Sequence, residues 1–190
     1  MILPIRAFGD PVLRKVGKDI DKDYPDLQEL IDNMFDTMNS ANGIGLAAPQ
    51  IGLDIRLFII DVSPLADDDD YEDIKDELKD FKKVFINAKI LEESGEEWKF
   101  NEGCLSIPDV REDVKRKSNI LIEYYDENFV KHTETFSDIR ARVIQHEYDH
   151  IEGTLFTDHL SSLKKKLVKG KLTKISQGDV SISYKMRFPK

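Results

Sequence analysis

Residues 137–151 read SDIRARVIQHEYDHI and contain the pattern H-E-x-x-H. The spacing predicts an amphipathic helix over this stretch, with Ser137 as its N-cap. His146 and His150 lie four residues apart, so both imidazoles face one side of the helix and can reach a single metal ion. Glu147 follows the first histidine and can accept a proton from metal-bound water. Two imidazoles leave the site incomplete, because an open catalytic metal site has three protein ligands.

The other elements follow from local patterns. Apolar residues recur at helical spacing from 27 to 38, which predicts a helix that ends before Asn42. Alternation over 180–188 predicts a closing strand. A further helix is expected over about 157–168, with Gly170 marking its end. Strands are expected over 55–62, 84–91, 120–125 and 129–136, the last two as a hairpin. These elements predict an α+β fold in which antiparallel strands pack around the central metal-binding helix, with an N-terminal helix and a C-terminal helix plus strand.

The third metal ligand has several candidates. Phe156 stands where a metzincin has its third histidine, and no glutamate follows Glu152, which excludes two common solutions. Asp158 and His159 remain open by residue type, although Asp158 precedes an apolar-periodic run and could be an N-cap.

Cys104 is the other candidate, and it is the only cysteine of the chain. It lies within EGCLSIP at residues 102–108, after Gly103, which allows close approach of the backbone. A lone cysteine is most often a small buried apolar residue. The missing ligand of the histidine pair favours a metal ligand here.

Three separated stretches together resemble the peptide deformylase family. They read GIGLAAPQ at 43–50, EGCLS at 102–106 and QHEYDH at 145–150, and GDPVLR at 9–14 is similar to the N-terminal stretch of that family. The resemblance covers about the first 165 residues. It implies a single catalytic domain over 1–190 that hydrolyses the formyl group from the N-terminal formylmethionine of nascent polypeptides and releases formate.

The resemblance also implies roles for individual residues. Cys104, His146 and His150 would bind the metal, and Glu147 would shuttle the proton. The oxyanion would be stabilised by the Gln50 side-chain amide and the Leu105 backbone N–H.

Substrate binding is expected along the glycine-containing motif. Gly43 would allow close approach of the backbone, while Ile44 and Gly45 would pair with an extended peptide; locally, the two glycines are equally consistent with a flexible turn. Family alignment places Ile44, Phe100, Ile139 and Val143 around the methionine side chain, with Glu102 among the substrate-binding residues. Phe100 and Ile139 are equally consistent with ordinary core positions.

One divalent metal ion per chain is expected. A thiolate with two imidazoles suits zinc and ferrous iron alike, and affinity alone favours zinc. The resemblance implies Fe²⁺ in the cell, with Zn²⁺ or Ni²⁺ in purified protein.

Charge and composition restrict the other possibilities. A net charge of −9 argues against broad nucleic-acid binding. The N-terminus shows no signal peptide or membrane span, and a lone cysteine fits a reducing compartment, so a cytoplasmic protein is expected. Residues 67–80 hold nine acids and two lysines, which predicts a solvated surface insertion. Residues 164–190 hold nine bases and one acid; this basic tail is either a solvated face or a ribosome contact.

Two other functions remain at this stage. A metallopeptidase of the H-E-x-x-H type would share the logic of His146, Glu147 and His150. A non-catalytic, metal-stabilised binding module would be expected to have four protein ligands, which the sequence does not suggest.

Overall fold

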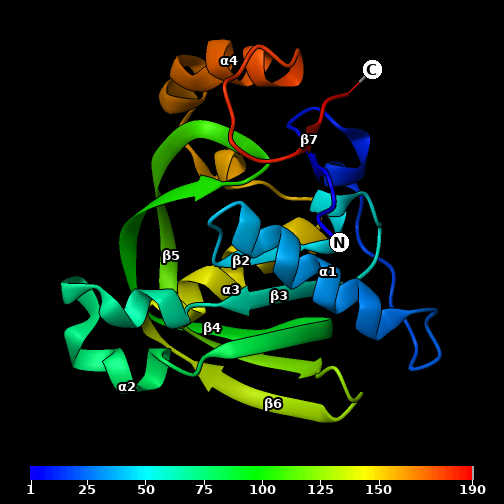
Figure 1. Ribbon diagram of the computed structural model, residues 1–190. Coiled ribbons are helices and arrows are strands. Elements are labelled where there is room, and N and C mark those ends of the chain that lie inside the picture. The colour runs from blue at the N-terminus through cyan, green and yellow to red at the C-terminus, as the bar shows by residue number, and fades with distance from the viewer. Residues whose placement is uncertain (190) are drawn as a thin grey trace.

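The computed structural model describes residues 1–189 (Figure 1), and Lys190, the last residue of the predicted basic tail, lies outside the described residues. Its helices are α1 (Leu27–Ser40), α2 (Lys75–Leu78), α3 (Asp138–Ile151) and α4 (Ser162–Ser176). Its strands are β1 (Ile5–Arg6), β2 (Gly45–Ala47), β3 (Leu57–Asp61), β4 (Lys82–Cys104), β5 (Ile107–Tyr125), β6 (Lys131–Phe136) and β7 (Met186–Arg187).

The sheet has five antiparallel strands in the order β2-β3-β4-β5-β6, and β1 pairs with β7 in a separate parallel pair. Helices α1 and α3 both lie against β2 and β3 (Figure 1). The predicted α+β class is therefore confirmed.

Strand β3 explains why α3 is central. Leu57 and Ile59 pack in the same cluster as the apolar face of α1, whereas Phe58 and Ile60 pack in the cluster that includes α3. Successive side chains of a strand point to opposite faces, so β3 is covered by a helix on each side. All four side chains are fully buried, as expected from the largely apolar run from residue 55 to 62.

Strands β4 and β5 are much longer than predicted. The predicted segments 84–91 and 120–125 are only the ends of a hairpin that continues to the Leu105–Ser106 turn. Residues 91–97 are exposed, so no apolar alternation reveals this part of β4. Backbone pairing across the hairpin carries the ladder through this exposed stretch. Nearer the turn, where Phe100 lies opposite Val114, the β5 side chains Val110 and Val114 are buried.

The acidic segment 67–80 is more ordered than predicted. It forms short 3₁₀ turns followed by α2, and its acidic side chains are mostly exposed as expected. Leu78, however, is fully buried, and Tyr71 and Ile74 pack against the same core cluster. These apolar residues anchor a segment whose charge alone suggested a purely solvated insertion.

The C-terminal elements also differ from prediction. Helix α4 starts at Ser162, with Ser161 as N-cap, and runs through Gly170 to Ser176, so Gly170 does not end it. The alternation over 180–188 describes burial rather than a full strand, because only Met186–Arg187 pair. Within residues 1–189, no helix is long and apolar enough to cross a membrane.

Ser137 occupies the predicted N-cap position of α3 but makes no side-chain cap bond; its hydroxyl donates to the Asp138 carboxylate instead.

Candidate active site

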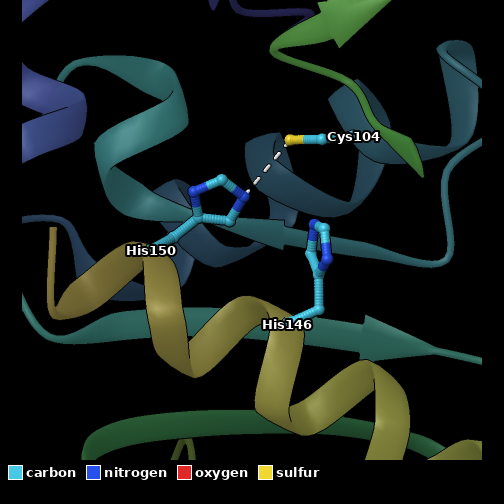
Figure 2. A group of neighbouring side chains, drawn as sticks. All are labelled: Cys104, His146 and His150. Atoms are coloured by element: carbon cyan, nitrogen blue, oxygen red, sulfur yellow. Dashed lines mark hydrogen bonds between the residues drawn. The ribbon is translucent and has the colours of Figure 1, made fainter. Parts of the chain in front are cut away.

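Cys104, His146 and His150 come together although about forty residues separate the cysteine from the histidines. Cys104 ends β4, and both imidazoles project from α3 toward it (Figure 2). One ligand atom from each residue lies within 4.8 Å of the others, and the Cys104 Sγ is 3.3 Å from the His150 Nε2. A thiolate and two imidazoles at this spacing fit a tetrahedral metal such as zinc or ferrous iron, with a fourth position left for substrate or water.

Asp158 and His159 are engaged elsewhere. The Asp158 carboxylate pairs with Arg14 and accepts from the Leu155 N–H, while the His159 Nε2 lies 2.8 Å from the Asp149 carboxylate. Asp158 is not the N-cap of α4, since Ser161 has that position.

Glu102 orients the first histidine. Its carboxylate accepts from the His146 Nδ1 at 2.9 Å, which leaves the Nε2 of that ring to face a metal. Arg116 and Arg142 donate to the same carboxylate at 2.7 and 3.0 Å. Burial raises the pKa of Glu102, but the hydrogen bonds from His146 and Arg116 outweigh it and hold the pKa well below its ordinary value. Glu102 borders the cleft, yet its carboxylate is taken up by protein groups.

Burial by itself would raise the pKa of the Cys104 thiol. The neighbouring His150 and His146 lower that pKa by more than burial raises it, so the thiol has a pKa of about 5. The cysteine is therefore a thiolate near neutral pH, the form that binds a metal.

Glu147 lies beside Cys104, His146 and His150, but its side chain forms no hydrogen bond with them. Its Oε2 is buried and has no hydrogen-bond partner within residues 1–189. Burial, which outweighs the nearby His146 and His150, raises the pKa of Glu147 to about 7. A carboxyl group with this pKa can both accept and return a proton near neutral pH.

Gly45 makes room for that carboxylate. A Cβ built at Gly45 would collide with the side chain of Glu147. Gly43 is similarly constrained, because a Cβ there would come within 2.7 Å of the Leu105 Cδ1. At both positions the lack of a side chain therefore lets the segment 43–45 lie close to another part of the chain.

Gln50 has a defined amide orientation. Its Oε1 accepts from the Ala47 N–H at 2.8 Å, so the Nε2 must point the other way. The Nε2 lies 3.5 Å from the Cys104 Sγ and 3.3 Å from the Ser106 hydroxyl. A polar N–H donor therefore faces the sulfur side of the site.

A cavity of about 540 Å³ lies over these groups. Of the predicted pocket residues, Ile44, Phe100 and Val143 line it, together with Gly43, Gly45, Gln50 and Leu105. Ile139 does not: it is buried in the core cluster on the α3 side of the sheet. Arg142 lines the cavity as well, and its guanidinium lies 4.4 Å from the Trp98 ring.

Sequence reasoning missed one wall of this cavity. Residues 181–184 line it, and they come from the segment after α4. The alternating apolar residues of 180–188 indicated that the segment packs against the rest of the protein, but no local pattern indicated which part of the protein it contacts.

A cysteine and two histidines placed so that they could hold a metal, with a buried carboxylate beside them in one cleft, are the arrangement of a metal-dependent hydrolase of the H-E-x-x-H type. The sequence model of the family described as polypeptide deformylase matches residues 2–166. The chain belongs to this family, and it is an enzyme that removes the formyl group from N-terminal formylmethionine. The metallopeptidase alternative is not favoured.

Individual relatives agree with this assignment. A peptide deformylase of Christiangramia forsetii is 66% identical over 190 residues, covering 100% of this chain and 97% of that protein. One of Flavobacterium johnsoniae is 61% identical, covering 99% and 96%. The crystal structure of a peptide deformylase from Legionella pneumophila superposes with a TM-score of 0.79 at 36% identity, covering 94% of this chain and 98% of that chain.

Proposed function

We propose that Cys104, His146 and His150 hold one divalent metal ion and that Glu147 is the general base of formyl hydrolysis. The observation that carries this proposal is the buried, unpartnered Glu147 Oε2 beside the three metal-binding atoms. A divalent ion bound there would supply Lewis-acid chemistry, lowering the pKa of water and polarising the formyl carbonyl.

Glu147 accepts a proton from the attacking water and passes it to the amide nitrogen, so that formate leaves and a free amine remains. Its raised pKa, about 7, suits both steps. Glu102 acts through another residue: its hydrogen bond to the His146 Nδ1 holds the imidazole in place.

The developing oxyanion needs donors already in position. The Gln50 Nε2 is aimed by the Ala47 hydrogen bond and cannot rotate without losing it. The Leu105 N–H lies in the turn that follows Cys104 and is the second donor.

The substrate peptide binds as an extended strand beside β2. This strand ends the five-stranded sheet, so one of its edges is available for pairing, and it begins with Gly45. Ile44, Phe100 and Val143 receive the methionine side chain in the cavity.

Two variants separate metal binding from catalysis. Glu147→Ala should retain its metal and lose at least roughly 10²-fold in kcat on a formylmethionyl peptide. Cys104→Ala should lose tight metal binding as well as activity. Metal content and formate release are measured on both. Wild-type kcat in the first, or wild-type metal content in the second, would contradict the assignment.

We infer that Fe²⁺ is the working metal and that the single catalytic domain acts in the cytoplasm. Enzyme purified without oxygen should contain iron and lose activity in air, as iron and the Cys104 thiolate oxidise. Nickel-substituted enzyme should keep its activity over the same period. Stable activity of the iron-loaded enzyme in air contradicts this choice of metal.

The basic face of α4 is proposed to contact the ribosome. Lys165, Lys166 and Lys169 are exposed, whereas Lys164 pairs with Glu112 at 2.8 Å and is left unchanged in the test. Replacing the three exposed lysines with Gln should weaken ribosome binding and its salt dependence while sparing hydrolysis of small formyl-peptides.

The matched control for this triple variant replaces three exposed lysines outside α4, namely Lys22, Lys89 and Lys99. Equal ribosome affinity of the two triple variants would leave the basic tail as a solvated face.

A further inference from the structure

The segment after α4 returns to the active site. The chain reverses at Gly178, where φ is +78°, and then runs to β7, which pairs with β1 (Figure 1). The Ile5 and Ala7 N–H groups donate to Lys185 and Arg187 carbonyls at 2.9 Å, which fixes the far end. Residues 179–185 therefore span a gap between two anchored points, and they lie beyond the part of the chain matched by the family's sequence model.

Within this span, residues 181–184 line the same cavity as Gln50, Cys104 and Glu147. Val180, Ile182 and Tyr184 are partly buried and Ser181 and Ser183 are exposed, so the segment lies along the cleft with one edge packed. It is part of the wall of the site.

Tyr184 reaches the reacting region from this wall. Tyr184 and Leu105 both pack against the core cluster that contains α1, and the Tyr184 hydroxyl donates to the Leu105 carbonyl oxygen at 2.7 Å. Burial, reinforced by Cys104 and Asp109, raises the pKa of Tyr184, so the hydroxyl keeps its proton and remains a donor.

The Leu105–Ser106 turn is held from several directions. The Ser106 carbonyl accepts from the Phe8 N–H at 2.9 Å, and the Ser106 hydroxyl lies 3.3 Å from the Gln50 Nε2. The Tyr184 hydrogen bond holds the preceding carbonyl. The Leu105 N–H and C=O lie in adjacent peptide planes that are separated by only two dihedral angles. Because Cys104 pairs with Ile107 across this two-residue turn, fixing the Leu105 carbonyl limits the rotation that remains to the turn, and with it the direction of the Leu105 N–H.

We propose that Tyr184 is a positioning residue for formyl hydrolysis, whose hydroxyl holds Leu105 so that its N–H points at the developing oxyanion. The inference rests on the proposed role of Leu105 as an oxyanion donor. It assigns part of the catalytic geometry to the segment after α4.

The test is Tyr184→Phe, which removes the hydroxyl and retains the ring. We expect kcat to fall roughly 3- to 10-fold, because the donor is loosened rather than removed, with KM little changed. Metal content and affinity for the deformylated product peptide should stay at wild-type values. The control is Tyr125→Phe, a partly buried tyrosine of the same core cluster, which should leave kcat unchanged.

Thermal unfolding of both variants is recorded, and kcat is measured below the onset of unfolding. Wild-type kcat in Tyr184→Phe, or a change confined to KM, overturns the inference. Gln50→Ala is assayed in parallel: a large loss of kcat there with no effect of Tyr184→Phe refutes the inference alone. Wild-type kcat in both variants refutes the proposed oxyanion site itself.

Discussion

At the residue scale, the active site depends on the absence of a side chain as much as on those present. Glu147 is buried with one oxygen unpaired, which costs folding free energy and is explained by the proposed role of this carboxylate as the base. The space beside it exists because residue 45 is glycine. The same residue begins β2, so the strand proposed to pair with substrate and the proposed base are in contact.

Gly45→Ala should therefore displace the Glu147 carboxylate and lower kcat by roughly 10²-fold, since small displacements of a catalytic group are expensive. Metal content should remain at the wild-type level, because the three atoms nearest to that Cβ all belong to Glu147 and none to the proposed metal ligands. Steady-state kinetics and metal analysis check both points. An alanine variant with wild-type kcat would show that the carboxylate does not need this position.

At the element scale, α4 contains a glycine that its helix does not require. Gly170 lies in the helix interior, is exposed, and a Cβ there would meet nothing within 4 Å. Glycine in a helix costs more backbone entropy than alanine.

Gly170→Ala should raise the free energy of unfolding by about 0.5–1 kcal/mol and the Tm by a few degrees. Gly178→Ala is the matched control, and it should destabilise, because φ at this position is +78°. Thermal unfolding measures both. A lower Tm for the Gly170 variant would contradict the reading of an unstrained helix interior.

The acidic segment is also an element-scale question. Leu78 fills a fully buried place in the core although its neighbours in α2 are charged. Leu78→Ala should lower the free energy of unfolding by about 2–5 kcal/mol, whereas Asp69→Asn, at an exposed position, should change it little. Equal stability of the two variants in denaturant titrations would contradict this prediction and would indicate that Leu78 does not anchor the segment to the core.

At the scale of the whole molecule, the proposed metal would join β4 to α3. An ion that binds the native state alone stabilises it by about 2.7 kcal/mol at a free concentration of 100 times its Kd. Chelation should therefore lower the Tm by roughly 5–10 °C. The Cys104→Ala variant should respond much less to the chelator, and an equal response would place the stabilising metal elsewhere.

The sequence alone was enough to predict the α+β class and to single out the three residues that the fold brings together as a possible metal site. Spacing within 137–151 put both histidines on one face, and the family resemblance favoured Cys104 as the third residue while Asp158 and His159 stayed open by residue type. Helix α1 and the buried strand β3 followed from apolar periodicity, which is a local property. Where the buried residues of an element recur regularly within one short stretch, the sequence pattern is sufficient to predict that element.

Tertiary structure decided what depends on partners distant in the chain. The β4–β5 hairpin extends through exposed residues because its backbone groups pair with each other, and no side-chain pattern records that. Ile139 lies in the core and not in the cavity, since packing against the sheet sets the rotation of α3. The return of Tyr184 to Leu105 joins residues 79 positions apart. Such a contact is stabilised only after the whole fold has brought both segments together, so the sequence could indicate that residues 180–188 pack but not that they complete the active-site wall.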